Sequence, residues 1–387
     1  MSRLSFDELD KIKKKYGVSI LWSWSRIDSY ITSPYEYYLK YILHKKEDIQ
    51  NCAYAPCGSL VHDCLERYYN GSITSEQMLE EFEDGWLTNI DIADLKFDRN
   101  DNTKNESIKK KYKYDIEHFF KNHKPMANKV ATEKFVTAKI GPHVLQGYID
   151  ATYKDNDKNF CIIDFKTSTK FSGKNLEEKS GQLTVYAIAL TQMGVPLDKI
   201  RIGFNMLKYC TVEYQQKNGT VKTRDIERCK IGESLQANAK MWLKDAGYST
   251  DKIDEYLKGL VDTNSIDSLP DDVRCRYKML DCFVWVPLTQ NLIDKWTEDI
   301  VSTINKILSV EKQYNQTHDE MLWWDDDEHV KNESFYFATL CGYSASLHKP
   351  YAKYLDNINT DNNNVGLFNN NMVVQDDSDL SWLDALL

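Results

Sequence analysis

The chain has 387 residues, of which 49 are basic and 59 acidic, so its net charge is −10. At about 150 residues per domain, this length allows one large or two modest domains with a substantial core. The negative charge excludes a generally basic nucleic-acid coat protein but permits a local cationic groove. Every apolar run falls far short of the roughly 20 residues of a membrane helix, and no charged-then-apolar leader opens the chain. We therefore expect a soluble, cytoplasmic protein.

The nine cysteines are spread along the chain without a CxxC pair. This spacing predicts neither a zinc ribbon nor a disulfide framework and is typical of a reducing cytoplasm. The chain also lacks a glycine-rich GKT or GKS loop, so we expect no ATP hydrolysis.

Helices are predicted for the first third of the chain. Apolar residues recur at three- and four-residue spacing over 25–43, with Pro34 placed to open a second helix. Further helices are expected over 60–69, after a break at 55–58, and over 75–87 and 107–120. The segment 104–124 carries seven lysines against three acids, which is typical of either an ordinary solvated helix or a DNA-binding face.

The hydrophobic period changes to two between Thr132 and Thr167, which predicts strands over 133–138, 143–153 and 159–167. A helix over 178–193 is followed by a hairpin of 199–214 and 221–227 around Asn218-Gly219. We expect irregular helical structure over 231–283, a long helix over 288–314 and a strand over 334–340. This order predicts an α/β or α+β core with helical embellishments.

The last part of the chain, from Asp356, is rich in Asn and Asp and predicts a disordered linker. It ends in an acidic tip with Trp and Leu, 376–387, which is either an inert tail or a short peptide that docks a helicase, polymerase or single-strand-binding protein. We therefore expect one domain over 1–355, with helical insertions near 67–128 and 231–283, and a tail over 356–387.

The most informative residues are Asp150, at the end of one predicted strand, and Asp164 with Lys166, at the end of the next. Residues 164 and 166 share one face of a strand, so their side chains reach the same small volume. Two carboxylates beside a lysine suit metal-assisted phosphodiester hydrolysis: the acids hold a divalent ion and the lysine orients or deprotonates a water. A buried ion pair at a strand end is the alternative.

Two helical pairs add to this pattern. Gly58 and His62 are four residues apart, as are Gln182 and Tyr186, so each pair shares a helix face. His62 could complete a metal shell or be an ordinary core histidine. Gln182 and Tyr186 could contact DNA or could simply belong to an amphipathic helix.

Five motifs together resemble, in order and spacing, the RecB-type branch of the PD-(D/E)XK nuclease superfamily. They are Ser23-Trp24-Ser25-Arg26-Ile27 with Tyr30 and Ser33-Pro34-Tyr35; Gly58-Ser59-Leu60-Val61-His62; Gly147-Tyr148-Ile149-Asp150; Asp164-Phe165-Lys166-Thr167; and Gln182-Leu183-Thr184-Val185-Tyr186.

The resemblance implies a restriction-endonuclease-like core, a central mixed sheet flanked by helices. It implies a Mg²⁺ or Mn²⁺ ion bound by His62, Asp150, Asp164 and the backbone carbonyl of Phe165. Lys166 takes the water-activating role, and the resemblance assigns DNA-side support to Gln182 and Tyr186. Glu133 matches an acid often found before the family's GxxD segment; a strand-edge charge is the alternative for this residue.

Many relatives bind an iron-sulfur cluster through one early cysteine and three late ones. Here Ser33 stands at the early position, and the late segment keeps Cys341 but has Ser344 at the next position. Because four thiolate ligands are not available in that arrangement, we expect no iron-sulfur cluster.

We therefore expect a metal-dependent deoxyribonuclease, an exonuclease of DNA recombination, repair or phage replication. A structure-selective or nicking endonuclease is one alternative, and a non-catalytic DNA-binding scaffold that recruits a partner through its tail is another. DNA affinity is expected from a cationic channel over the site. Its candidate lysines are Lys109, Lys110, Lys111 and Lys113.

Overall fold

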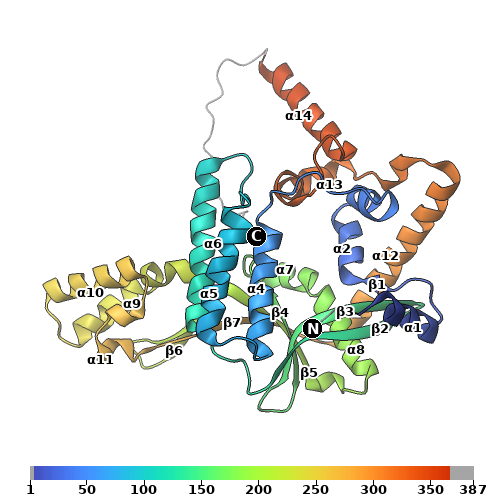
Figure 1. The fold of residues 1–387 in the computed structure, drawn as a ribbon. Coiled ribbons are helices and arrows are strands. Elements are labelled where there is room, and N and C mark those ends of the chain that lie inside the picture. Colours follow the sequence, from blue (N-terminus) through green and yellow to red (C-terminus); the bar gives the residue numbers. More distant parts are fainter. Residues whose placement is uncertain (1–3, 367–387) are drawn as a thin grey trace.

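The computed structural model describes residues 4–366, and its centre is a seven-stranded mixed sheet (Figure 1). Antiparallel pairs join β2 to β3 and β3 to β4, β4 and β5 are parallel, and β6 and β7 pair antiparallel with β5. The predicted α/β fold with a central mixed sheet is thus confirmed. The strands are β1 (Trp22–Ser23), β2 (Val130–Ile140), β3 (His143–Lys154), β4 (Phe160–Lys166), β5 (Ile200–Gln215), β6 (Val221–Glu227) and β7 (Tyr277–Val286).

Helices cover both faces of the sheet. Successive residues of β4 belong to different cores, because side chains alternate along a strand: Ile162 packs with α8 and α12, and Ile163 packs with α4 and α6. The first layer comprises α2 (Trp24–Thr32), α3 (Pro34–Tyr37), α8 (Gly181–Gln192), α12 (Gln290–Thr317) and α13 (Asp327–Asn332); the second comprises α4 (Tyr54–Tyr69), α5 (Ser75–Trp86) and α6 (Asn102–Asn122). None of the helices in the described part of the chain is long and apolar enough to cross a bilayer.

A third core forms an arm that projects from the body (Figure 1). In this arm the far ends of β5, β6 and β7 pack against α9 (Ile231–Asp245), α10 (Thr250–Thr263) and α11 (Asp271–Arg274). The sequence predicted only irregular helical structure over 231–283, whereas residues 277–286 form β7. The remaining helices are α1 (Phe6–Tyr16), α7 (Gly173–Lys179) and α14 (Lys349–Gly366).

Three further predictions of local structure were wrong. The expected break at 55–58 lies inside α4, because Pro56 falls in the first helical turn, where its missing N–H costs no hydrogen bond. The expected helix over 178–193 is interrupted at Ser180, between α7 and α8. The segment expected as a strand, 334–340, ends in a π-helical turn, Tyr336–Leu340.

The predicted tail begins inside a helix, since α14 continues past Asp356 to Gly366. The acidic tip 376–387 lies outside the described residues.

Candidate active site

A gap beside β3 creates the floor of the site. On one side of β3, β1 pairs with Leu145 and Gln146, and β4 pairs from Ala151 onward. The intervening stretch 147–150 therefore faces a cleft instead of a strand. Asp150 and Asp164 are the first residues beyond the last β3–β4 pair, Ala151 with Ile163, so they lie where the two strands separate.

A third acid lies on the other side of Asp150. The register of β2 and β3 pairs Thr132 with Ala151 and Lys134 with Ile149, which places Glu133 opposite Asp150. Glu133 has a left-handed backbone (φ 49°), which is uncommon for a residue other than glycine and interrupts the ladder at this point. Glu133 and Asp150 both line the cleft. The acid that the resemblance singled out thus lies beside the candidate metal ligands.

The Asp150 carboxylate lies among groups that have opposite effects on its pKa. Its Oδ2 accepts a hydrogen bond from the backbone N–H of Phe165 (3.1 Å) and lies 3.4 Å from His62 Nδ1. Burial, and then the charge of Asp164, raise the pKa of Asp150 to about 7. The charge of Asp164 thus disfavours a negative charge on Asp150.

His62 joins α4 to β4. Its Nε2 lies 2.9 Å from the Phe165 carbonyl oxygen, and its ring meets the Phe165 ring edge-on. The structure therefore brings together three of the four predicted metal ligands: His62, Asp150 and the carbonyl of Phe165.

Asp164 and Lys166 form the second half of the site. Asp164 is 3% exposed, and its Oδ2 lies 2.7 Å from Lys166 Nζ without a hydrogen bond of good geometry. Desolvation lowers the pKa of Lys166, but the charges of Asp164, Asp150 and Asp28 outweigh this effect and leave the pKa above its usual value. Lys166 is therefore an ammonium group that pairs with Asp164.

Tyr186 fills the place of the missing strand beside β3. Its hydroxyl donates to the Tyr148 carbonyl (2.7 Å) and accepts from Gln182 Nε2 (3.0 Å). The ring packs on Gly147, where an added Cβ would lie 2.7 Å from Tyr186 Cε1. Gln182 and Tyr186 thus brace the floor of the cleft, and both also line it.

We expect Gly147→Ala to displace Tyr186 and to lower the free energy of unfolding by about 1 to 3 kcal/mol, because the crowded ring belongs to the core. Urea unfolding would measure the change. Gly58→Ala is the matched control, because a Cβ there meets only Thr167 Oγ1, at 3.9 Å. That variant should be neutral or more stable, since alanine favours a helix interior. Equal destabilisation by both substitutions would contradict this packing argument.

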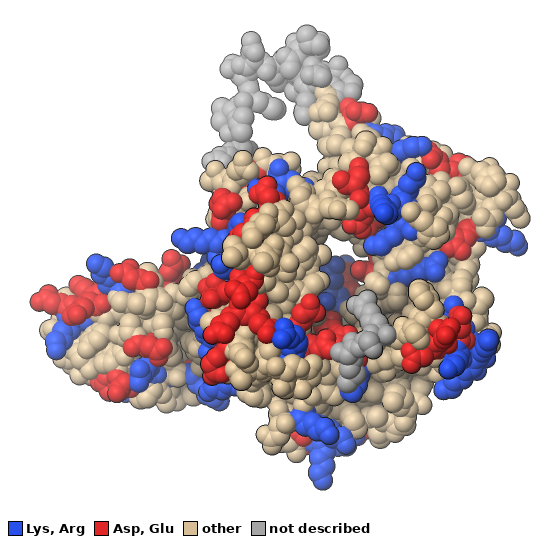
Figure 2. Space-filling model, viewed as in Figure 1, with Lys and Arg blue, Asp and Glu red and all other residues tan. Residues whose placement is uncertain are grey.

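The cleft has a volume of about 1700 Å³ and an acidic lining. Figure 2 shows Asp and Glu side chains gathered beside this hollow. Among the described residues, eight acids line it against three lysines, where the sequence predicted a cationic channel. The acids are Asp28, Asp63, Glu66, Glu133, Asp150, Glu178, Asp299 and Glu333, and the lysines are Lys166, Lys179 and Lys295.

The four lysines predicted to bind DNA lie on α6, outside the described lining of this cleft. Lys109 pairs with Asp91 (2.7 Å) and Lys111 with Glu227 (2.7 Å). Lys113 lies 3.9 Å from Glu117. A DNA-binding role for Lys109, Lys110, Lys111 and Lys113 stays a prediction.

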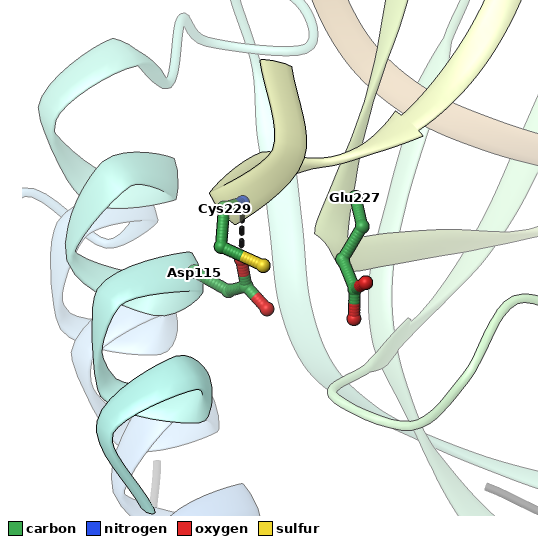
Figure 3. A group of neighbouring side chains, drawn as sticks. All are labelled: Asp115, Glu227 and Cys229. Atoms are coloured by element: carbon green, nitrogen blue, oxygen red, sulfur yellow. Dashed lines mark hydrogen bonds between the residues drawn. The ribbon is translucent and has the colours of Figure 1, made fainter. Parts of the chain in front are cut away.

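A separate cluster joins α6 to the end of β6 (Figure 3). The ligand atoms of Asp115, Glu227 and Cys229 all lie within 4.8 Å of one another, the one such trio of metal-ligand side chains in the part of the chain described. Both Glu227 oxygens already meet ammonium groups, Lys111 at 2.7 Å and Lys230 at 3.1 Å. We interpret this cluster as a structural contact between α6 and the end of β6, in which two lysines offset the charge of Glu227.

Ser33, the residue at the early iron-sulfur position of relatives, belongs to a buried hydrogen-bonded group. Its Oγ donates to Asp325 Oδ2 (2.9 Å) and lies 3.0 Å from His348 Nε2. Near the late position, Cys341 Sγ lies 3.6 Å from Glu36 Oε2. Hydrogen bonds thus join the early and late segments here.

Asp28 is a site residue that the sequence analysis missed. It lies on α2 and lines the cleft, where desolvation raises its pKa and the charges of Lys179 and Lys166 oppose that rise. The sequence carried no signal for this role, because an acid on a helix is typical of an ordinary solvated position.

The donor set fits a hard divalent cation. Two carboxylates, a carbonyl oxygen and an imidazole are suitable ligands for Mg²⁺ or Mn²⁺. The raised pKa of Asp150 and the poorly satisfied Asp164 Oδ2 both indicate negative charge that the surrounding residues do not fully compensate.

Comparison with known proteins agrees with this geometry. No curated protein matches the chain. The family description "PD-(D/E)XK nuclease superfamily" matches residues 21–319, a span that includes the gap in the sheet, His62, both aspartates, Lys166 and Tyr186. The chain belongs to the PD-(D/E)XK nuclease superfamily.

Proposed function

We propose that the chain is a Mg²⁺- or Mn²⁺-dependent deoxyribonuclease of the RecB-type branch that digests DNA from an end. The observation that carries the proposal is that β3 and β4 separate at Asp150 and Asp164, where His62 Nδ1 lies 3.4 Å from Asp150 and Lys166 Nζ lies 2.7 Å from Asp164. A divalent ion bound there supplies charge neutralisation for the phosphate and a more acidic water.

The surrounding residues have distinct roles in this proposal. His62, Asp150, Asp164 and the Phe165 carbonyl hold the cation. Neutralisation of the two carboxylates by a cation would remove their effects, which raise the pKa of Lys166, and would leave burial opposed by the charge of Asp28. Lys166 would then be better placed to accept a proton from the attacking water.

A roof over the cleft supports action from an end. In Figure 1, α13 lies between the upper ends of α4 and α2, the two walls of the cleft. The loop 44–53 connects these walls, and segment 341–344 bonds to it: Ile49 N–H donates to the Gly342 carbonyl (2.9 Å), and Tyr343 Oη donates to the Lys45 carbonyl (2.9 Å). Strand ends enter such an enclosure more easily than the middle of a long strand.

The lining of the cleft favours a single strand, because unpaired bases expose faces that can stack on aromatic rings. Trp24 and Phe171 in its lining offer rings on which bases can stack.

A digestion panel tests the proposal. We expect end-labelled linear single strands to be degraded in Mg²⁺ or Mn²⁺, while closed circles and linear strands with streptavidin on both ends resist. Cleavage of circles as fast as linear strands would favour the alternative, an endonuclease. Absence of cleavage of every substrate would favour the second alternative, a non-catalytic scaffold whose tail recruits a helicase, polymerase or single-strand-binding protein.

The cellular process that fits an end-directed DNA nuclease is recombination, repair or phage replication. The complete set of His62, Asp150, Asp164 and Lys166 speaks against a scaffold that has lost catalysis.

A further inference from the structure

A chain of short hydrogen bonds runs from the arm to α4, the helix that carries His62. Tyr69, at the end of α4, has its Oη 2.7 Å from His123 Nε2. His123 Nδ1 lies 2.7 Å from Asp281 Oδ2 on β7. Arg228 lies directly after β6, between this strand and α9 of the arm, and its Nη2 donates to Asp281 Oδ1 (2.9 Å).

The chain is buried and has a defined direction. The side chains of His123, Arg228 and Asp281 are 0%, 2% and 11% exposed. A carboxylate only accepts hydrogen bonds, so His123 Nδ1 donates to Asp281 Oδ2, and its Nε2 is left to pair with the Tyr69 hydroxyl. Each member therefore fixes the orientation of the next.

At one end the chain reaches the metal ligands. Tyr69 is seven residues after His62, so both side chains lie on one face of α4. Both rings contact the ring of Phe165: Tyr69 lies parallel to it with centroids 6.4 Å apart, and His62 meets it edge-on at 5.9 Å. The carbonyl of this same Phe165 is 2.9 Å from His62 Nε2.

At the other end the chain reaches the strand beside the catalytic one. Arg228 Nε donates to the Leu207 carbonyl (2.9 Å), in the stretch where the pairing of β5 with β7 is irregular. The preceding residue, Met206, is the ladder partner of Lys166. The network therefore holds β4 from two sides, at Phe165 and beside Lys166.

We propose that Tyr69 is a positioning residue for the metal site. Through His123, Asp281 and Arg228, it holds α4 and β4 at the spacing that aims His62 and the Phe165 carbonyl at one cation. The inference rests on the proposed metal dependence, and it makes the geometry of the site depend on where the arm joins the body.

Tyr69→Phe removes the hydroxyl but keeps the ring on Phe165. We expect Mn²⁺ binding, measured by electron paramagnetic resonance without DNA, to weaken about tenfold, as for other residues that orient metal ligands. The matched control is Tyr277→Phe, which removes a buried hydroxyl that donates to Asn238 inside the arm. The control should leave Mn²⁺ affinity unchanged.

Asp281→Asn should weaken Mn²⁺ binding too, and the double variant with Tyr69→Phe should bind no more weakly than the poorer single variant, because both changes interrupt one chain. A lower melting temperature of Tyr69→Phe with unchanged Mn²⁺ affinity would overturn the inference alone. Failure of the unsubstituted protein to bind Mn²⁺ would overturn both the inference and the proposed function.

Discussion

Asp164→Ala is expected to reduce the rate of DNA cleavage by at least about a thousandfold, because it removes one of the two carboxylates proposed to hold the cation. Mn²⁺ binding should be lost together with cleavage. The fold should remain, since Asp164 contributes backbone pairing with Phe204 that alanine preserves, and its removal relieves the repulsion with Asp150. Steady-state cleavage, Mn²⁺ titration and circular dichroism would measure the three quantities.

Lys166→Ala separates catalysis from metal binding. It should lower cleavage to a similar extent but leave Mn²⁺ bound, because the ammonium group is not a ligand. The matched control for both variants is Asp225→Ala, which breaks an ion pair with Lys170 (3.0 Å) outside the described lining of the cleft. Retained turnover in either site variant, or equal loss in the control, would contradict the site assignment.

Asp150→Asn is expected to raise the free energy of unfolding of the metal-free protein. The same variant is expected to lack nuclease activity when metal is supplied. Burial and the charge of Asp164 raise the pKa of Asp150 from 3.8 to about 7. A carboxyl whose pKa is raised by folding binds its proton more tightly in the folded state, so stability falls as pH rises between these two values. At pH 8 the full cost is present, on the order of 2 to 4 kcal/mol, and asparagine removes it.

Urea unfolding in EDTA at pH 8 and at pH 5 would test whether Asp150→Asn raises or lowers the free energy of unfolding. The advantage of Asp150→Asn should be large at pH 8 and should shrink toward pH 5, where the native carboxyl keeps its proton. Saturating Mg²⁺ should reverse the order, since only the unsubstituted site gains from the cation. A variant that is less stable at pH 8 without metal would show that the two aspartates do not repel.

The strands between residues 130 and 227, and the acids at their ends, could be predicted from the sequence because each depends on local information. An apolar run followed by Asp164 and Lys166 fixes a strand end and a shared face without knowledge of distant residues. The convergence of Asp150 and Asp164 needed the family resemblance, because pairing register depends on contacts across the sheet.

The character of the cleft could not be predicted in this way. The lysines of α6 look like a binding face in sequence, but Lys109 and Lys111 are paired with Asp91 and Glu227, which are distant in the chain or on other elements. Asp28 looks like an ordinary solvated helix residue until α2 is placed across from Lys166. β7 was missed for a related reason, since a strand enclosed by helical segments is stabilised by its distant partner β5 rather than by local propensity.

The hydrogen bond between Ser33 and His348 spans 315 residues of sequence. During synthesis from the N-terminus, the proposed site residues, which lie within 62–186, emerge long before segment 341–344, which bonds to the loop over the cleft. A nascent or truncated chain ending near residue 320 would thus carry the proposed site residues without the segment that roofs the cleft. Under the proposed end-directed cleavage, such a chain should also cut closed circles.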